Sequence, residues 1–256
     1  MSKDANLVSL STIDEEFFGV KTAKVVGLRQ EDILEVLNYC ETNHVKFLIA
    51  RCSTTDLQTV QEMERLGFLI MDTLIYFSCN TRANPIPIDD LEFQVRAFRP
   101  GEEDIIKSVA AEAFQGYLGH YHADSRLDAK KCDEVYTDWA YRSCLSKDFA
   151  DQVLVVHLYR NIIGFGAMRI NKQNEGELHL SGIVPSFQGR GVHRLIVISF
   201  MNWCFDKGLE QMVISTQITN LASQKVWIRL GFEPRHSYYT FHKWFDQQGR
   251  KDIRYV

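Results

Sequence analysis

The sequence predicts an α/β (α+β) fold in which a smaller N-terminal α/β segment precedes a longer C-terminal domain. Short apolar or alternating segments typical of strands are interspersed with segments of helical period. The segment NTRANPIPIDD at 80–90 disfavours regular structure through its prolines, asparagines and aspartates. We therefore predict an N-terminal domain over 1–80, a linker over 81–90 and a C-terminal domain over 91–256.

The C-terminal part begins with a strand and two helices. LEFQVRAF at 91–98 alternates apolar and polar residues, which indicates a strand. Asp104 and the two glutamates before it favour the start of a helix in the segment that follows. A polar, aromatic and glycine-containing loop is expected over 115–128. KKCDEVYTDWAYRSCL at 130–145 has a helical period and predicts the second helix.

Strands dominate the rest of the chain. Two β-branched runs within 151–171 predict a hairpin with its turn at Arg160-Asn161, and GELHLSGIV predicts a further strand. The apolar segment from Val192 to Lys207 predicts a helix that Gly208 closes. QMVISTQ, NLASQKVWIRL and HSYYTFHKWF predict a strand, a helix and a last strand. The order after the linker is therefore β-α-α-β-β-β-α-β-α-β.

A strand–helix–LGF–strand pattern occurs twice. DLQTVQEMERLGF at 56–68 and NLASQKVWIRLGF at 220–232 each follow a short apolar strand and precede another. Two interpretations stay open: chance convergence on a common βαβ pattern, or a second, degenerate copy of half a domain. The first copy has no glycine-rich turn beside it, so we expect the N-terminal segment to be structural and to resemble a partial repeat.

Composition excludes several classes of protein. The net charge of −4 argues against a nucleic-acid binder, which usually carries a basic excess. The most apolar stretch, near Leu195–Phe205, is too short to span a bilayer, and MSKDANLVSL has no signal-peptide core. We therefore expect a cytoplasmic protein with no membrane insertion and no nucleic-acid partner.

The segment HLSGIVPSFQGRGVHRLIV at 179–197 carries the most chemical information. An apolar strand leads through Pro185 to QGRGV and then to an apolar helix. The two glycines allow a tight turn with outward-facing N–H groups, and the helix N-terminus adds partial positive charge. With Arg190 and Arg194, this arrangement could receive a pyrophosphate. Taken alone, the same pattern also fits a plain strand-to-helix turn, and it is neither a Walker A loop nor GxGxxG.

At this point the chain resembles the GNAT superfamily, whose signature is Gln/Arg-x-x-Gly-x-Gly/Ala. The matching residues are Gln188, Gly189, Arg190, Gly191, Val192 and His193. IVP before the motif and the N…LGF unit after it also match, and the resemblance covers about residues 91–256. His193 departs from the final small residue. The resemblance implies the GNAT fold, with a central mixed, mostly antiparallel sheet, and acyl-CoA as co-substrate with no metal.

The resemblance also implies where coenzyme A would bind. Its pyrophosphate would lie on the backbone N–H groups of Gln188 to His193. Its pantetheine would pair with Ile183 and Val184, beside the splayed strand QMVISTQ. Asn220 would hydrogen-bond the pantetheine arm, with Ser223 one helical turn further along.

Amine acylation calls for a base and an acid. Glu177 lies eleven positions before Gln188, which is the spacing of the base in histone-acetylating relatives of the superfamily. Glu177, His179 and Ser181 would share one strand face, so Glu177 or His179 could be the base, or the row could be an exposed polar face. In many relatives a tyrosine that acts as the general acid stands where this chain has Trp227. We expect Trp227 to have a packing role instead. Tyr238 and Tyr239 are the candidate acids.

The whole chain is most similar, within the superfamily, to sugar-nucleotide N-acyltransferases such as the dTDP-fucosamine acetyltransferases. FFGVKTAKV at 17–25, the LGF unit at 66–68, AAEAF and STQITN carry this similarity. It implies that the acceptor is an amino-dideoxy sugar on dTDP, used for lipopolysaccharide O-antigen or another bacterial surface polysaccharide. Such a ligand needs aromatic rings that stack on its base and hydrogen-bond donors for its phosphates. The residues suited to these roles are Tyr117, His120, Tyr121, His122, Arg126, Tyr136 and Trp139.

Several alternatives stay open. The acyl group could be acetyl or a larger hydroxyacyl such as 3-hydroxybutanoyl. The amine could belong instead to a peptide, a polyamine or an aminoglycoside, or the chain could bind acyl-CoA without catalysis. His120 and His122 have HxH spacing, but no further clustered ligand supports a metal site. The chain could be a monomer or a homodimer.

Overall fold

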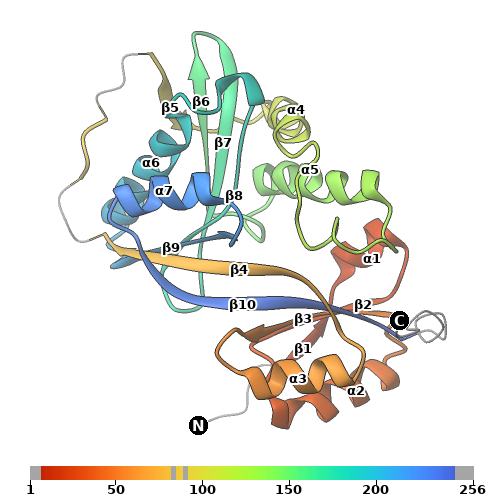
Figure 1. Ribbon diagram of the computed structural model, residues 1–256. Helices are drawn as coiled ribbons and strands as arrows, with labels where there is room; N and C mark the ends of the chain where they lie inside the picture. The colour runs from red at the N-terminus through yellow and green to blue at the C-terminus, as the bar shows by residue number, and fades with distance from the viewer. Residues whose placement is uncertain (1–6, 82–84, 89–91, 246–256) are drawn as a thin grey trace. The chain divides into compact units, whose positions relative to one another are not determined.

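The computed structural model describes residues 7–81, 85–88 and 92–245, and its contacts divide the chain into two compact units (Figure 1). Unit 1 comprises residues 1–74, 118–131 and 237–256, and unit 2 comprises residues 75–117 and 132–236. No helix in the described part of the chain has the length and apolarity needed to cross a membrane.

Unit 1 is built on the strands β1, β2, β3 and the end of β10, in that order across the sheet. Its elements are β1 (Val8–Leu10), α1 (Thr12–Phe18), β2 (Thr22–Val26), a short 3₁₀ helix η1 (Gln30–Asp32), α2 (Ile33–Thr42), β3 (Phe47–Ser53), α3 (Leu57–Arg65) and parts of β4 (Leu69–Asn80) and β10 (Glu233–Trp244). β2 and β3 are parallel, whereas β10 runs antiparallel to β3 with Tyr238 opposite Ser53 and Trp244 opposite Phe47. Apolar side chains of β2, β3, α2 and β10 form its core.

Unit 2 has the sheet order β4-β9-β8-β7-β6-β5. Its further elements are β5 (Gln94–Ala97), α4 (Glu103–Ala113), α5 (Ala129–Leu145), β6 (Gln152–Leu158), β7 (Asn161–Ile170), β8 (Gly176–Ile183), η2 (Pro185–Phe187), α6 (Val192–Asp206), β9 (Gln211–Gln217) and α7 (Leu221–Arg229). β5 to β8 pair antiparallel, and β8 pairs parallel with β9. The predicted order of elements is confirmed, and the sheet is mixed and mostly antiparallel. The hairpin turn lies at Tyr159-Arg160, one residue earlier than predicted.

The predicted strand–helix–strand pattern is present twice, with the same local geometry. Asp56 and Asn220 each cap a helix by accepting a hydrogen bond from the backbone N–H three residues on. Gly67 and Gly231 end these helices at φ 78° and 86°, where a residue with a side chain would be strained. The phenylalanine after each glycine is buried. Descent of both copies from one half-domain stays a prediction.

The two units do not follow the predicted division at 81–90. Residues 118–131 and 237–256 belong with the N-terminal residues, because β10 supplies the strand beside β3. The unit boundary cuts β4 after Leu74 and β10 after His236, so the last strand of each repeat is divided between the units. Within the predicted linker, residues 82–84 and 89–90 lie outside the described residues, and residues 81 and 85–88 form no helix or strand.

Helices cover both faces of the unit 2 sheet, with α6 and α7 on one side and α4 and α5 on the other (Figure 1). The α6 face is packed closely through glycine. A side chain at Gly166 would lie 2.6 Å from Phe200 and 2.7 Å from Ile196, both on α6. A side chain at Gly176, at the start of β8, would overlap the sulfur of Cys204 on the same helix. These glycines let α6 lie directly on β7 and β8.

We expect Gly176→Ala to lower the free energy of unfolding by roughly 1–3 kcal/mol, since the added methyl overpacks the core against Cys204. Chemical denaturation measures this change. The matched test is Gly176→Ala with Cys204→Ala, which removes the overlapping sulfur. The double variant should be more stable than the sum of the single changes predicts. Simple additivity would contradict this account of the packing.

Candidate active site

Two parallel strands of unit 2 separate after a very short pairing. β8 and β9 pair only from Gly176 to Leu178 on one side and from Met212 to Ile214 on the other. Beyond this point β8 continues to Ile183 and β9 to Gln217 without pairing with each other. The backbone edges that face each other past Leu178 therefore have room for an extended ligand between them.

The loop after β8 presents unused backbone N–H groups. Gly189 and Gly191 have φ values of 75° and 88°, and Gly191 precedes the first residue of α6. Among the described residues, no carbonyl accepts a hydrogen bond from the N–H groups of residues 189–193. The N–H of Gln188 donates to the carbonyl of Pro185 at 3.2 Å. The loop and the helix N-terminus together form a concentrated set of donors suited to an anion.

The charged residues of this loop have partners of their own. The guanidinium of Arg190 forms an ion pair with Glu92 and lies 5.4 Å from the ring of Phe93 and 5.1 Å from that of Phe187. Because both side chains of this ion pair are exposed, the pair contributes little to stability. Arg190 could therefore release Glu92 and bind a phosphate instead. Arg194 is exposed on the first turn of α6.

His193 and Trp227, the two residues that depart from the superfamily pattern, are hydrogen-bonded to each other. The indole N–H of Trp227 donates to Nε2 of His193 at 2.9 Å. Burial lowers the pKa of His193 to about 4, so its ring is neutral and can accept this hydrogen bond. Trp227 is buried in the core and contacts Phe77 edge to face. The expected packing role of Trp227 is confirmed, and its N–H is used within the protein.

The residues expected to hold pantetheine lie at the separation of the strands. Val184 donates its N–H to the carbonyl of Ile163, so its amide points towards β7. The carbonyl of Ile183 accepts a hydrogen bond from the side chain of Gln188 at 3.2 Å. Asn220 accepts from the N–H of Ser223 at 3.3 Å and donates to Thr216 at 2.9 Å, and so joins the end of β9 to the start of α7.

The polar residues of β8 are divided by a bulge. Leu178 pairs with Met168 and Leu180 with Ala167, so His179 has no partner on β7. His179 stacks on Trp139 of α5 at 5.3 Å, whereas Ser181 pairs with Gly166, which faces α6. The predicted common face is therefore wrong for Ser181. The extra residue of the bulge reverses the alternation, and Glu177 and His179 remain on the α5 side.

Glu177 and His179 have different surroundings. The carboxylate of Glu177 accepts hydrogen bonds from Arg169, and the two side chains form an ion pair at 2.9 Å. Both ring nitrogens of His179 are buried, and no hydrogen-bond partner for them exists among the described residues. Burial, followed by the charge of Arg169, lowers the pKa of His179 to about 3. His179 is therefore a neutral imidazole with a lone pair that no protein group uses.

Three of the predicted acceptor-binding residues belong to unit 2. Tyr117 and Tyr136 lie edge to face at 5.1 Å, and both contact Phe114. The hydroxyl of Tyr117 donates to Gln217, the last residue of β9. Trp139 stacks on His179. These aromatic residues and the polar end of β9 lie on the α5 side of unit 2.

The other predicted acceptor-binding residues, His120, Tyr121, His122 and Arg126, belong to unit 1. His120 and Tyr121 are buried and engaged there. Nδ1 of His120 lies 2.9 Å from Nε2 of His242, whose Nδ1 lies 2.8 Å from Asp124. Burial lowers the pKa of His120 well below its ordinary value.

The remaining polar groups of this part of unit 1 form a connected network. Burial alone would raise the pKa of Asp124, but hydrogen bonds from His242 and Trp244 lower it below its ordinary value. Tyr121 donates to the buried Asp14 at 2.5 Å, and Asp14 also pairs with Lys24 at 2.5 Å. His122 is partly buried, and Arg126 lies over the ring of Trp244.

The candidate acids also belong to unit 1. Tyr238 and Tyr239 lie on β10 opposite Ser53 and Cys52 of β3, and Tyr239 packs against the unit 1 core. For residues 7–81, 85–88 and 92–245, no group of three or more histidine, cysteine, aspartate or glutamate side chains is placed to hold a metal ion.

Sequence reasoning missed three residues of the site. Arg169 pairs with Glu177 across β7 and β8, and Thr216 and Gln217 hold Asn220 and Tyr117. The register of the hairpin could have shown Arg169, because it lies opposite Glu177 in an antiparallel pair. No local signal marks Gln217, whose contact with Tyr117 joins residues one hundred positions apart.

Comparison with known proteins connects this geometry with a family. Residues 117–232 match the model of the Acetyltransferase (GNAT) family. The spore coat polysaccharide biosynthesis protein SpsD of Bacillus subtilis (strain 168) is 22% identical over 152 residues, which are 59% of this chain and 51% of that protein. The mycothiol acetyltransferase of Nocardia farcinica (strain IFM 10152) is 30% identical over 78 residues, 29% of this chain and 26% of that protein. The chain thus spans about half, or less, of the length of these relatives.

A solved structure shows the same fold. The GCN5-related N-acetyltransferase from Sphaerobacter thermophilus superposes with a TM-score of 0.63 at 13% identity, over 93% of this chain and 76% of that chain.

We expect His193 to make the chain less stable in acid. Because burial lowers its pKa from 6.5 to about 4, the unfolded chain takes up a proton in this window that the folded chain does not. The free energy of unfolding should fall as the pH decreases from 6.5 to 4, by up to about 1.4 kcal/mol for each pH unit. Urea unfolding at pH 7 and pH 5 measures this.

The control is His193→Gln, whose amide oxygen can still accept from Trp227 but cannot be protonated. Its stability should depend less on pH than that of the unchanged chain. The same pH dependence in both proteins would show that His193 does not contribute in this way.

Proposed function

Because this chain carries, in residues 117–232, a domain of the acetyltransferase (GNAT) family, we propose that it transfers an acyl group from coenzyme A to an amine. The observation that supports this most is the loop at 188–193. Its N–H groups are unused among the described residues, and it begins the helix beside two separating strands. This is the arrangement that a pyrophosphate with an extended arm requires.

We propose that the loop binds the pyrophosphate of acyl-CoA and that the pantetheine extends between β8 and β9. The N–H groups of residues 189–193 would hold the phosphates, since that of Gln188 is already used. Ile183 would offer the strand edge, whereas Val184 would contribute less because its N–H points towards β7. Asn220 and Ser223 would border the arm from the start of α7.

We propose His179 as the base and Glu177 as the residue that supports it. His179 has a free lone pair on the α5 side of the sheet, whereas the carboxylate of Glu177 is paired with Arg169. Burial and the charge of Arg169 hold the pKa of His179 at about 3, and Glu177 would support His179 by pairing with that cation when the imidazole takes the proton of the amine.

The departing thiolate needs an acid other than the tyrosine that serves this role in many relatives. Trp227 occupies the position of the tyrosine found in many relatives, and its N–H donates to His193 inside the core. Tyr238 and Tyr239 remain our proposed acids. Once donor and acceptor are held together, proximity supplies much of the rate, so the acid need not dominate catalysis.

We propose a dTDP-linked amino-dideoxy sugar as the acceptor, for surface polysaccharide synthesis. The name of the Bacillus subtilis relative, a spore coat polysaccharide biosynthesis protein, agrees with a sugar acceptor. Tyr117, Tyr136 and Trp139 offer stacking rings in unit 2, and His120, Tyr121, His122 and Arg126 belong to unit 1. The acyl group would be acetyl or a short hydroxyacyl. The second candidate is acetyl transfer to another amine, in keeping with the name of the mycothiol acetyltransferases.

Mass spectrometry after incubation with acetyl-CoA or 3-hydroxybutanoyl-CoA and a panel of dTDP-amino sugars tests the function. We expect one amino sugar to gain the mass of the acyl group.

Gly191→Ala should weaken acyl-CoA binding by roughly tenfold or more, because Gly191 has φ 88° in the proposed phosphate-binding loop.

The matched control for this loop is Gly208→Ala. Gly208 has φ 68° at the other end of α6, and neither glycine has an atom within 4 Å of an added side chain. Equal acyl-CoA affinity in the two variants would remove the loop from the binding site. Absence of acyl transfer to every dTDP-amino sugar would remove the proposed acceptor.

For the base, we expect His179→Ala to lower kcat by roughly 10²–10⁴-fold with little change in acyl-CoA affinity. Glu177→Gln should have a smaller effect. Arg169→Gln removes both the partner of Glu177 and a charge that lowers the pKa of His179, so it should lower kcat far less than His179→Ala. Steady-state kinetics with the identified acceptor measures these values. If the double change Glu177→Ala with His179→Ala keeps full activity, neither residue is the base.

A further inference from the structure

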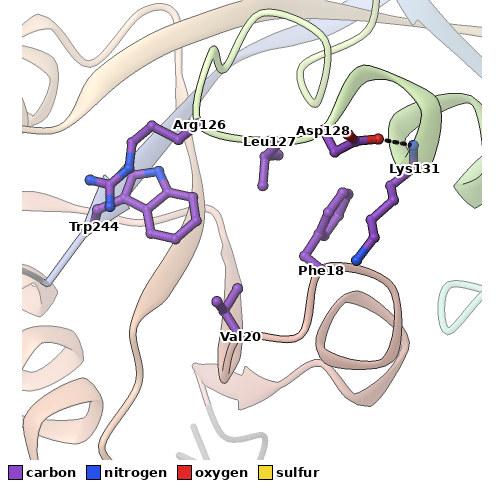
Figure 2. A pocket seen from close by; sticks show the side chains of 7 residues that line it. All are labelled: Phe18, Val20, Arg126, Leu127, Asp128, Lys131 and Trp244. Carbon is purple, nitrogen blue, oxygen red and sulfur yellow. Dashed lines mark hydrogen bonds between the residues drawn. The ribbon is translucent and has the colours of Figure 1, made fainter.

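Unit 1 contains a pocket of about 490 Å³, and Arg126 is one of the residues that line it (Figure 2). It lies entirely within this unit and brings together α1, the loop after it, the start of α5 and the end of β10. The lining residues are Phe18, Val20, Arg126, Leu127, Asp128, Lys131 and Trp244. This volume is within the range of pockets that bind small ligands.

One wall of the pocket is a layered stack of flat groups. The indole of Trp244 lies against the ring of Phe47 at 4.5 Å, with 19° between the ring planes. The guanidinium of Arg126 lies 4.0 Å from the centroid of the same indole. Trp244 is also fixed by its hydrogen bond to Asp124 at 2.9 Å. Figure 2 shows Arg126 beside Trp244, and Phe18 standing on the other side of the pocket. The pocket is therefore bordered by rigid planar surfaces to which another ring could be added.

The charge of the lining is mostly positive. Arg126 and Lys131 contribute two cations, and Asp128 contributes one carboxylate. The Oδ1 atom of Asp128 accepts a hydrogen bond from the backbone N–H of Lys131 at 3.0 Å, at the start of α5. None of the ion pairs formed by the described residues includes the ammonium of Lys131, which extends alongside Phe18 in Figure 2. An anion in this pocket would meet two cations and one carboxylate, whose Oδ1 already accepts a hydrogen bond from the protein.

We propose that this pocket binds a planar heterocycle that carries a phosphate group, which is the chemistry of a nucleoside diphosphate. The ring would stack on the flat groups around Phe18, Arg126 and Trp244, and the phosphates would pair with Lys131 and Arg126. Val20 and Leu127 would contact the apolar part of the ligand. This inference rests on the proposed function, because the nucleotide would be that of the sugar-nucleotide acceptor.

Isothermal titration of the full chain with dTDP tests the proposal, with thymidine and inorganic pyrophosphate as partial ligands. We expect dTDP to bind more tightly than either part, because the ring and the phosphates contact different walls. Lys131→Gln should weaken dTDP binding by roughly tenfold, as expected for the loss of one charged phosphate contact. The matched control is Lys130→Gln, which changes the neighbouring exposed lysine on α5 that does not line the pocket.

The outcomes separate this inference from the proposed function. If Lys130→Gln and Lys131→Gln bind dTDP equally well, the nucleotide does not occupy this pocket, even if the chain still acylates a dTDP-amino sugar. If dTDP does not bind at all while acyl-CoA does, both the pocket assignment and the sugar-nucleotide acceptor are wrong, and acyl transfer to another amine stands. Pyrophosphate binding as tight as that of dTDP would overturn the role of the aromatic wall.

Discussion

The site in unit 2 depends on the early separation of two parallel strands. If β8 and β9 stayed paired beyond Leu178, the backbone groups of β8 that face β9 would be used by the sheet as far as Ile183. Their separation leaves an open edge, and the glycines at 189 and 191 turn the chain so that α6 begins beside it. Close packing of α6 on Gly166 and Gly176 fixes the helix on the sheet. The strand edge, the glycine-containing loop and the helix N-terminus are therefore parts of one arrangement.

Much of this arrangement could be predicted from the sequence, because its signals are local. The QGRGV turn, the apolar helix after it and the alternation of β8 each lie within one short segment. The order of elements in the C-terminal part and the two strand–helix–LGF–strand units followed from periodicity and from capping residues such as Asp56 and Asn220. These patterns are strong because few other conformations satisfy both the burial of the apolar positions and the turn chemistry.

What could not be predicted depends on contacts between distant residues. The bulge at His179 is defined by its partner strand, so the change of face at Ser181 has no signature in β8 itself. His193 and Trp227 each stood out as unusual, but only the structure shows that they form one hydrogen-bonded pair. The aromatic and histidine-rich segment 115–142 looked like a single binding surface, yet its residues are divided between two units. Linear proximity did not reveal that His120 would be buried beside His242.

The pairing of β10 with β3 has a consequence for synthesis on the ribosome. β3 is completed by Tyr238–Trp244, which are made long after β3 itself. During translation, one side of the backbone of Phe47, Leu48 and Ile49 therefore stays unpaired until β10 has emerged. An open, apolar strand edge of this kind invites pairing with other nascent chains. The order of the strands along the chain thus lengthens the time for which this edge is open to incorrect pairing.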